Sequence, residues 1–342
     1  MKRKYQFKIA VVILNWNGKK YLEQFIPLLI KNSCAEDLVL YVADNGSTDG
    51  SVNFLKENYP EIRLITFDKN YGFTGGYNRA LQKISAEYYV ILNSDVEVTP
   101  GWILPVIEKM DADRQVAAAM PKIKAFHNKD YFEYAGAAGG FIDKYGYPFC
   151  RGRILDTIEK DEGQYDDARE IFWTSGACMF VRSDIFHAHN GFDDDFFAHM
   201  EEIDLCWRMK NSGYKIMYYS DVTVFHVGGG VLPNNSPFKL YLNYRNNLFM
   251  LYKNLPGHNL YFILFLRMVL DGLSAIVYLV QFNFKSFVAV LKAHFSLYAS
   301  IKKLNKKRKL QPSKLIHKEQ FPESILLKYF LKKQKKFKNF NF

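Results

Sequence analysis

Acidic side chains stand just after two short apolar segments of the chain. Asp44 follows residues 38–43, and Asp95 lies two positions beyond residues 88–93. A carboxylate at the end of a buried strand can accept hydrogen bonds from a base or a ribose. It can also hold Mg²⁺ or Mn²⁺ against a diphosphate, because these ions need only one or two carboxylates when phosphate oxygens and waters complete the shell. Taken alone, Asp44-Asn-Gly-Ser is equally typical of a turn.

A glycine-rich segment, Asp68-Lys-Asn-Tyr-Gly-Phe-Thr-Gly-Gly-Tyr-Asn-Arg-Ala80, lies between these two acidic residues. Its glycines would let backbone N–H groups approach a phosphate at the start of a helix. The segment has neither the Gly-Lys-Ser/Thr of a P-loop nor the spacing of a GxGxxG dinucleotide motif. It therefore indicates a phosphate contact without naming the nucleotide.

A third group of acids, Glu201, Glu202 and Asp204, occurs in the segment Phe196–Arg208. A general base must be an ionised carboxylate within hydrogen-bond reach of the reacting hydroxyl. Glu202 and Asp204 would point about 200° apart on a helix, so both cannot serve one substrate. The alternative is a solvated acidic helix start, which the helix dipole favours.

The elements that must position these residues follow from an alternation of short apolar runs with helix-length polar segments. The predicted strands are residues 9–14, 38–43, 62–67 and 88–93, and the predicted helices are residues 21–31, 51–58, 76–84 and 101–113. This alternation is typical of the α/β class, in which βαβ units build a mostly parallel central sheet flanked by helices. Ligands of such sheets bind beyond the carboxyl ends of the strands.

Charge and hydropathy divide the chain into three zones. Residues 1–250 are expected to form a catalytic domain, 251–300 an apolar helical segment and 301–342 a basic tail. The last zone holds 14 Lys and Arg against 2 acidic residues, so the net charge of +11 belongs to it. Lysines beside aromatic residues favour an anionic lipid surface. The near-neutral remainder argues against a nucleic-acid-binding protein.

The apolar zone is interrupted by Arg267, Asp271 and Lys285. Its uncharged run, Gly272–Phe284, has 13 residues and would be about 20 Å long as a helix, against a hydrocarbon core of about 30 Å. This favours helices that lie on a membrane. A single crossing helix and simple packing on the catalytic domain stay open as alternatives.

Composition excludes several classes of protein. The 342 residues are 49% hydrophobic and 24% charged, which is ordinary for a globular protein and excludes collagen, coiled coil and wholesale disorder. Four cysteines lie far apart without a CxxC pair, which indicates a reducing cytosol. The apolar run near the N-terminus is short and leads into Asn15 without a cleavage site, so we expect a first strand and a protein that is not exported.

Together these motifs resemble the family 2 glycosyltransferases, which use the nucleotide-binding GT-A fold. The segments that carry the resemblance, in family order, are Val12-Ile-Leu-Asn-Trp-Asn17, Asp44-Asn-Gly-Ser-Thr-Asp-Gly50, Asn70-x-Gly-Phe-x-Gly-Gly-x-Asn78, Leu92-Asn-Ser-Asp-Val-Glu97, Trp173-Thr-Ser-Gly-Ala177, Gly191-Phe-Asp193, Glu201-Glu-Ile-Asp-Leu-Cys-Trp-Arg208 and His226-Val-Gly-Gly. By pattern, the chain looks like the bacterial rhamnosyltransferase-type enzymes of cell-surface polysaccharide assembly.

The resemblance implies a site for a nucleoside-diphosphate sugar, in which Asp44 binds the nucleobase and the glycine-rich segment lies along the phosphates. The residues that it implies for this site are Asn15, Asn17, Asp44, Asn70, Gly72, Phe73, Gly75, Asn78, Asn93, Asp95, Trp173 and Gly176. Asp95 and His226 would bind Mg²⁺ or Mn²⁺. Asn93 stands where the family's Asp-x-Asp motif has its first acid, which leaves one carboxylate fewer and puts the metal affinity in doubt.

The resemblance further implies an inverting displacement in which Glu202 takes the proton of the acceptor hydroxyl, with Asp204 and then Glu201 as the next candidates. The acceptor would be a glycan or a lipid-linked glycan at the cytoplasmic face of the cell membrane. A catalytically degenerate transferase-like scaffold is an alternative, motivated by Asn93 and Glu202. A sugar-phosphate nucleotidyltransferase is another, although such enzymes usually have a Gly-rich basic loop that Asn15-Trp-Asn-Gly-Lys19 does not supply.

Overall fold

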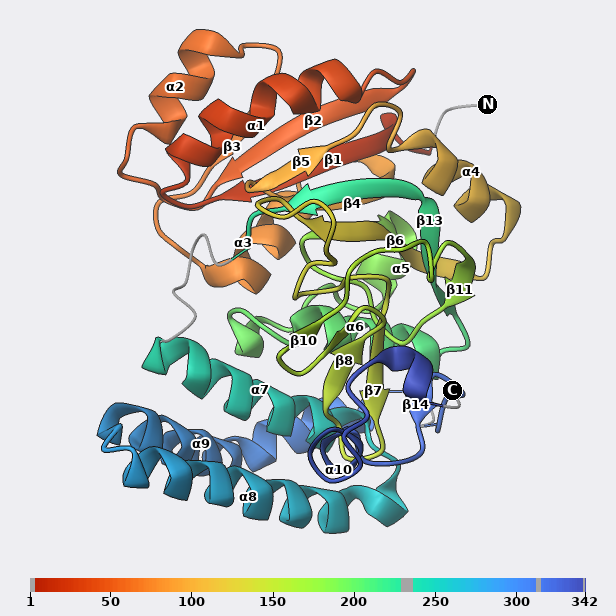
Figure 1. The fold of residues 1–342 in the computed structure, drawn as a ribbon. Helices are drawn as coiled ribbons and strands as arrows, with labels where there is room; N and C mark the ends of the chain where they lie inside the picture. The colour runs from red at the N-terminus through yellow and green to blue at the C-terminus, as the bar shows by residue number, and fades with distance from the viewer. Residues whose placement is uncertain (1–3, 229–235, 312–314, 341) are drawn as a thin grey trace.

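A mixed nine-stranded sheet forms the centre of the protein in a computed structural model that describes residues 4–228, 236–311, 315–340 and 342 (Figure 1). The strand order is β11-β13-β6-β12-β4-β1-β2-β3, with β5 paired to β13 beside this path. The strands are β1 (Phe7–Asn15), β2 (Leu38–Asp44), β3 (Arg63–Thr66), β4 (Ala86–Asn93), β5 (Val96–Val98), β6 (Val116–Ala125), β11 (Ala168–Glu170), β12 (Cys178–Arg182) and β13 (Lys215–His226).

The first half of the sheet is parallel, as predicted. The strand β1 pairs in parallel with β2 and β4, and β2 pairs in parallel with β3. Because β1 is buried between two neighbours and beneath helices, its sequence is a continuous apolar run. The helices that follow these strands are α1 (Lys19–Asn32), α2 (Ser51–Asn58), α3 (Gly72–Leu81) and α4 (Leu104–Ala112). The helix predicted from residue 76 thus begins four residues earlier.

The second half of the sheet is mixed. The strand β12 runs antiparallel to both β4 and β6, whereas β13 is parallel to β6. The chain passes from β12 to β13 through α5 (Ser183–Ala188), the 3-10 turn η1 (Asp194–Phe196) and α6 (Glu201–Asn211). Pairing of β13 with β5 brings His226 opposite Val96, next to the end of β4.

A second sheet lies beside the first and includes the end of the chain. Its order is β10-β9-β8-β7-β14, formed by β7 (Gly140–Asp143), β8 (Pro148–Cys150), β9 (Arg153–Ile154), β10 (Thr157–Ile158) and β14 (Gln320–Phe321). After it follow α10 (Ile325–Phe330) and the turn η2 (Phe337–Asn339). Phe337 and Phe340 are buried and pack against Phe149 of this sheet. Phe321 and Tyr329 are buried as well, whereas Phe330 is exposed, so most aromatic residues after residue 301 pack in the core.

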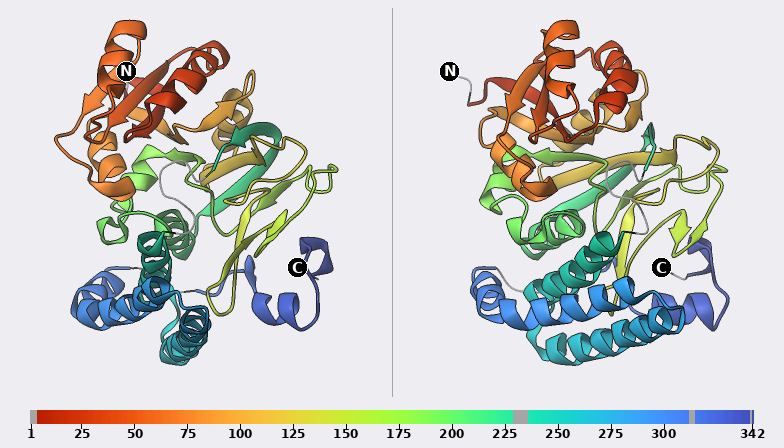
Figure 2. Two further views of the ribbon diagram at one scale, coloured as in Figure 1. Left: turned by 60° about the vertical axis from the view of Figure 1, so that its left-hand side comes forward. Right: turned by 90° about the vertical axis from the view of Figure 1, so that its left-hand side faces the viewer.

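Three long helices lie together at the end of the molecule away from β1, β2 and β3 (Figure 2). They are α7 (Pro237–Asn254), α8 (Gly257–Val280) and α9 (Phe284–Lys309). The boundaries expected at residues 250 and 300 both fall inside helices. The group of three long helices begins at Pro237 and ends at Lys309.

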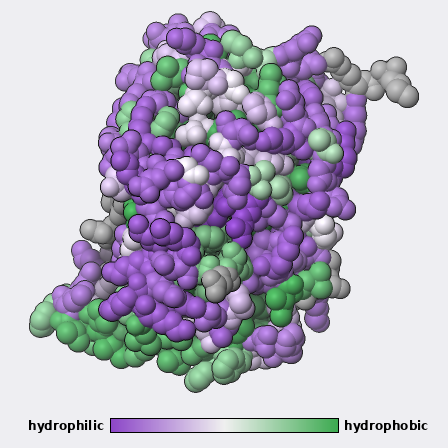
Figure 3. Space-filling model, turned by 45° about the vertical axis from the view of Figure 1, so that its right-hand side comes forward, coloured by the Kyte–Doolittle hydropathy of each residue, from purple (hydrophilic) through white to green (hydrophobic). Residues whose placement is uncertain are grey.

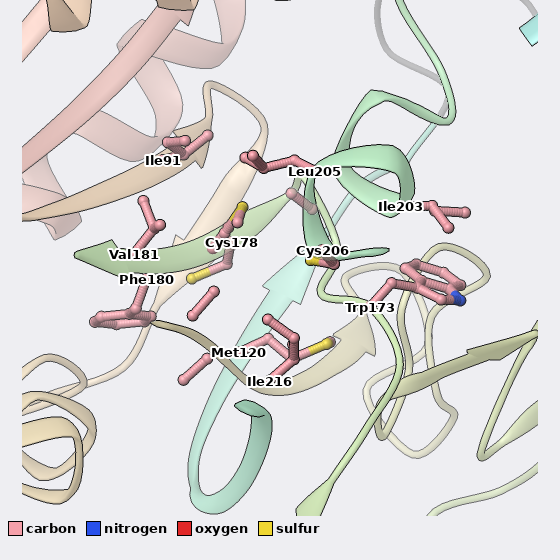
Figure 4. Packing of buried hydrophobic residues seen from close by; sticks show 14 of the residues in the cluster. Ile91, Met120, Trp173, Cys178, Phe180, Val181, Ile203, Leu205, Cys206 and Ile216 are labelled. Atoms are coloured by element: carbon pink, nitrogen blue, oxygen red, sulfur yellow. The ribbon is translucent and has the colours of Figure 1, made fainter. Parts of the chain in front are cut away.

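The interior between the sheet and α6 is apolar and closely packed. Figure 4 shows side chains of β4, β12 and α6 in one cluster, with Ile91, Cys178, Phe180 and Leu205 at most 1% exposed. Burying one such large side chain stabilises the fold by about 1.5–3 kcal/mol. All four cysteines are free thiols, as their wide spacing predicted. This core fixes α6, and with it the acidic residues at the start of that helix.

Candidate active site

The carboxyl ends of β1 and β2 hold a buried pair of polar side chains. Asn15 and Asp44 are partners in the strand register, and Asn15 Nδ2 donates to the Asp44 carboxylate at 2.9 Å. The other Asp44 oxygen accepts the N–H of Ser47 at 2.9 Å. Asn17 closes the same loop, since its Oδ1 accepts the N–H of Thr48 at 2.8 Å. Asn15 Oδ1 is buried without a hydrogen-bond partner among the described residues, so it is free to accept one from a ligand.

Asn45 fixes the glycine-rich segment to the end of β2. Its Nδ2 donates to Asn70 Oδ1 and to the Gly72 carbonyl, both at 3.0 Å. Gly72 has a φ of +74°, and a Cβ there would lie 2.7 Å from the carbonyl oxygen of Phe197. The same carbonyl accepts the N–H of Phe73 at 2.7 Å. Glycine is required at position 72 both by its backbone conformation and by the close approach of a second loop.

Two residues predicted along the nucleotide have structural partners instead. Asn78 Nδ2 donates to the Phe192 carbonyl and to Asp194, each at 2.7 Å, and its Oδ1 accepts the Phe192 N–H. The ring of Phe73 lies over Gly176, where a Cβ would be 3.2 Å from it. These contacts join α3 to the loop before α6 and to the start of β12. Asn78 therefore positions the site and does not point into it.

A second polar cluster lies at the end of β4. Asp95 Oδ1 is 3.2 Å from His226 Nε2, and Asn93 Nδ2 is 3.4 Å from the same nitrogen. On the other side of the ring, Glu133 Oε1 is 3.4 Å from His226 Nδ1. Burial disfavours the imidazolium, but the charges of Glu133 and Asp95 outweigh it and raise the pKa of His226 to about 10. Burial also opposes ionisation of Asp95, yet its hydrogen bond with His226 keeps the pKa of Asp95 below the usual value.

Asp95 and His226 fit two adjacent positions in the shell of Mg²⁺ or Mn²⁺. Ligands that lie about 2.1 Å from an octahedral ion at right angles are about 3 Å apart, close to the 3.2 Å between these two atoms. Glu133 stands where a carboxylate commonly orients a metal-bound histidine. Within the described residues, His, Cys, Asp and Glu side chains form no cluster of three or more suited to a metal. A diphosphate and waters would have to complete the shell, and His226 would have to lose its proton.

The acidic start of α6 is not a solvated one, since Glu201 is buried and Glu202 is half-buried. Glu202 Oε2 and Glu201 Oε2 are both buried without a hydrogen-bond partner among the described residues. Burial raises the pKa of Glu202 to about 7. Burial, with the neighbouring Glu202 charge, raises the pKa of Glu201 well above its usual value. Glu202 is thus partly ionised near neutral pH, as a general base requires, whereas a solvated helix start would leave both acids with ordinary pKa values.

Asp204 points to the other side of α6, as the helical spacing predicted, and its carboxylate is fully used. It is 0% exposed and lies 2.8 Å from each of Arg208, Lys253 and Asn254. A carboxylate shared by two buried cations has no lone pair directed at a substrate. The structure therefore removes Asp204 as the second candidate for the base and makes it a structural residue.

Asp204→Asn is expected to lower the free energy of unfolding by about 3–5 kcal/mol, because it leaves the buried Arg208 without its counter-charge and Lys253 with Asp193 alone. Urea unfolding followed by circular dichroism measures this change. The matched control is Asp221→Asn, which removes an exposed partner of Lys109 and should cost less than about 1 kcal/mol. Equal effects of the two variants would contradict the structural role of Asp204.

The segment before α6 has an unusual backbone. Phe197, His199 and Met200 have φ values of +65°, +69° and +70°, and each such non-glycine residue costs of order 1–3 kcal/mol. Asn246 of α7 holds the segment by donating to the His199 carbonyl at 2.7 Å and to two other carbonyls. The His199 Nε2 atom is buried without a partner among the described residues, and burial lowers the pKa of His199 to about 4. Strain of this kind is concentrated at functional sites.

Trp173 does not belong to the donor site. It is 4% exposed, and its Nε1 donates to the Phe141 carbonyl at 2.8 Å, so it is a core residue between the two sheets. Gly75, also predicted there, is buried within α3. Sequence patterns missed Asn246 and Glu133. The polar run Arg245-Asn246-Asn247 within an otherwise amphipathic segment is a sequence signal for Asn246, whereas no pattern distinguishes Glu133.

Polar side chains gathered at the carboxyl ends of parallel strands define the class of nucleotide-binding α/β folds. A family model described as "Glycosyl transferase family 2" matches residues 10–188, which is more than half of the chain. The chain belongs to glycosyltransferase family 2.

Curated relatives and solved structures agree with this assignment. The N-acetylglucosaminyl-diphospho-decaprenol L-rhamnosyltransferase of Mycobacterium tuberculosis is 26% identical over 236 residues, covering 64% of this chain and 75% of the relative. A rhamnosyltransferase of Escherichia coli is 27% identical over 225 residues, covering 64% of this chain and 81% of the relative.

Among solved structures, GalNAc-T7 with UDP, GalNAc and Mn²⁺ superposes with a TM-score of 0.59 at 14% identity. The match covers 74% of this chain and 49% of that one, so this chain spans about half of its length. A mannosyltransferase from Pyrobaculum calidifontis, solved with GDP-Man and Mn²⁺, gives a TM-score of 0.51 at 15% identity and covers 90% and 84% of the two chains. These likenesses confirm the predicted GT-A fold.

Proposed function

We propose that this glycosyltransferase moves a sugar, such as rhamnose, from a nucleoside-diphosphate sugar to a hydroxyl of a lipid-linked glycan during synthesis of a cell-surface polysaccharide. The observation that carries the proposal is the Glu202 carboxylate, whose Oε2 is buried without a hydrogen-bond partner among the described residues, in the helix that follows the strained segment Phe197–Met200. Two rhamnosyltransferases among the relatives support the sugar, and the name of one of them specifies a diphospho-decaprenol acceptor.

Each part of the reaction has a residue suited to it. Asn15 and Asp44 accept hydrogen bonds from the base or ribose. The first N–H groups of α3 are bonded within the protein, Gly72 to Asn70 and both Phe73 and Thr74 to the Phe197 carbonyl, so the glycine-rich segment shapes the site without offering these donors to a phosphate. Glu202 accepts the proton of the acceptor hydroxyl as that oxygen attacks the anomeric carbon. The bond from this carbon to the diphosphate oxygen breaks, and the electron pair leaves with the diphosphate. Attack from the face opposite the leaving group inverts the configuration.

Asp95 and His226 are the residues that would hold Mg²⁺ or Mn²⁺, which when bound supplies positive charge beside the departing diphosphate. Their spacing supports this assignment. The two GT-A structures solved with Mn²⁺ support it as well. The raised pKa of Glu202 favours an active enzyme over a degenerate scaffold, because burial of an idle glutamate would destabilise the fold without benefit.

We propose that α8 and α9 hold the protein against a membrane surface. Arg267 and Asp271 face inward, where they lie 3.6 Å apart and Arg267 stacks on Tyr147. The outward face of α8 is uncharged and exposed, and consists of Tyr261, Phe262, Phe265, Val269, Leu273, Ile276, Val277, Leu279 and Val280. Figure 3 shows apolar surface along the lower edge of the molecule. Surface helices of soluble proteins have the opposite arrangement, whereas helices that lie in a membrane interface bury an apolar face in lipid.

By length and composition, α8 is the one helix in the described part of the chain that could cross a membrane. Its inward face packs on α7 and on the second sheet through the Arg267–Tyr147 contact. A crossing helix would have to leave these contacts and carry Arg267 and Asp271 into lipid, which is costly. We therefore propose a peripheral position at the cytoplasmic face.

Turnover of a donor panel tests the proposed reaction. The full chain is incubated with dTDP-rhamnose, UDP-GlcNAc or GDP-mannose, Mn²⁺ and a membrane extract as acceptor, and release of the nucleoside diphosphate is measured. We expect one donor to be consumed, with the sugar recovered in the lipid fraction. Consumption of pyrophosphate instead would identify a nucleotidyltransferase, and no turnover of any donor would support a degenerate scaffold.

Phe265→Glu together with Ile276→Glu is expected to weaken binding to phosphatidylglycerol vesicles by roughly tenfold or more, because each removes a large apolar side chain from the lipid-facing surface. Co-sedimentation measures the bound fraction. Leu104→Glu on α4 is the matched control, since Leu104 is also an exposed apolar side chain but lies at another end of the molecule. Equal binding by both variants would contradict the assignment of the membrane face.

A further inference from the structure

A groove of about 670 Å³ lies between the first turns of α7 and the first half of α9. Its walls are mainly apolar, formed by Phe238, Val288, Ala289 and Phe295 among others. Two cationic side chains, Lys285 and Lys292, also line it. Neither lysine has a carboxylate partner in the part of the chain that the structure describes. The groove thus combines an apolar wall with free positive charge.

The groove borders the exposed apolar surface formed by α8 and α9. On α9, the outward stripe of exposed apolar residues is Phe284, Val288, Leu291, Phe295 and Tyr298. Lys285 and Lys292 are seven residues apart, so at 100° per residue they lie on one line along the flank of this stripe. Lysines at the flank of a lipid-facing stripe reach the level of the phosphate headgroups. The groove therefore opens at the height of the membrane surface.

One lining residue of the groove, Phe238, contacts the segment that precedes α6. The ring of Phe238 is 6.0 Å from that of Phe197, and the Phe197 carbonyl accepts the N–H groups of Phe73 and Thr74 at the head of α3. Glu202 follows Phe197 by five residues. Asn246, on the same helix as Phe238, holds the intervening carbonyls. One helix thus forms a wall of the groove and also positions the loop that precedes the base.

We propose that this groove binds the diphosphate end of a lipid-linked acceptor, with the lipid chain along Val288 and Phe295, the phosphates at Lys285 and Lys292, and the glycan directed toward Glu202. The proposal rests on the function proposed above and specifies how its acceptor is held. Charge complementarity selects the occupant, because α9 contains eight Lys and Arg and no acidic residue. A second copy of the same helix would be repelled, whereas a lipid diphosphate neutralises the charge.

Calorimetric titration of the full chain with farnesyl diphosphate tests the groove. We expect Lys285→Glu with Lys292→Glu to raise the dissociation constant at least about tenfold, since two charge-assisted contacts are lost. The matched control, Lys302→Glu with Lys306→Glu, makes the same change of charge further along α9 and should shift it by less than about threefold. Ala299→Phe fills the groove without changing charge and should also weaken binding at least about tenfold, which separates the groove from general electrostatics.

Three results would overturn the proposal. One is equal weakening by the two lysine pairs, which would assign binding to bulk charge. Another is inorganic diphosphate binding as tightly as farnesyl diphosphate, which would remove the role of the apolar wall. The third is the absence of farnesyl diphosphate binding by the unmodified chain. If the chain turns over a donor but does not bind farnesyl diphosphate, the proposed function holds and the groove assignment is wrong. If it binds farnesyl diphosphate but turns over no donor, the groove assignment holds and the proposed function is wrong.

Discussion

Glu202→Gln is expected to lower kcat for sugar transfer by about 10²–10⁴-fold, because the amide cannot accept the proton of the acceptor hydroxyl. Binding of the donor should change little, since the role proposed for Glu202 concerns the acceptor. In the unmodified enzyme, the carboxyl with a pKa of about 7 is protonated at lower pH and cannot act as a base. The logarithm of kcat/KM should therefore fall with a slope of about one per pH unit below pH 7. The Gln variant should lack this acid limb.

Stability supplies a control for this variant. The pKa of Glu202 in the fold, about 7, is above the ordinary value of 4.5. Folding therefore favours the protonated form, and the stability that it contributes is lost as pH rises from the ordinary value through the folded one. At pH 8 the Gln variant should melt at a higher temperature than the parent. A loss of activity together with a gain in stability cannot come from unfolding.

Glu201→Gln is the matched comparison, since it makes the same change one residue earlier. Burial raises the pKa of Glu201 well above its usual value, which favours the neutral form that glutamine reproduces. We expect this variant to retain most of its turnover. A reversal, with Glu201→Gln inactive and Glu202→Gln active, would move the base to Glu201.

The parallel half of the fold could be predicted because each of its strands is buried on both faces and gives a continuous apolar run. The antiparallel course of β12 could not, since Cys178–Arg182 has the same apolar character and direction leaves no mark on composition. For a related reason, the sequence did not predict that the segment after residue 301 packs on the second sheet. Its phenylalanines alternate with lysines, and sequence alone does not tell whether Phe337 contacts lipid or, as in the structure, packs on Phe149.

The positions of the residues at the strand ends were predictable from the order of strands and helices. Asp44, Asp95 and His226 lie at the sheet edge where the pattern placed them, because parallel strands end together. The different roles of Glu202 and Asp204 in α6 could not be assigned from their spacing alone. Helical periodicity separates Glu202 from Asp204 by about 200°, but only the partners Arg208 and Lys253 show which of the two faces is structural. Glu133 comes from a segment of irregular structure between strands and reaches His226 only through the tertiary fold.

Asp95→Ala is expected to lower metal-dependent turnover by about 10²-fold or more, the usual scale for losing a group that stabilises charge in the transition state. The substitution removes the only carboxylate of the Asn93-Ser-Asp95 segment. His226 is then the one proposed ligand that remains for the metal. A second readout is independent of catalysis: Mn²⁺ should raise the melting temperature of the parent in the presence of UDP, GDP or dTDP, and this shift should vanish in the variant.

The control for the metal assignment is Glu97→Gln. Glu97 is an acid only two residues away, but it pairs with Lys129 on the outside of β5, so its removal should leave both readouts within about twofold of the parent. Glu97 would be a ligand if its variant lost the Mn²⁺ shift. Turnover by the Asp95 variant at the parental rate, in buffer with EDTA as well as with Mn²⁺, would instead mean that the diphosphate leaves without a divalent ion.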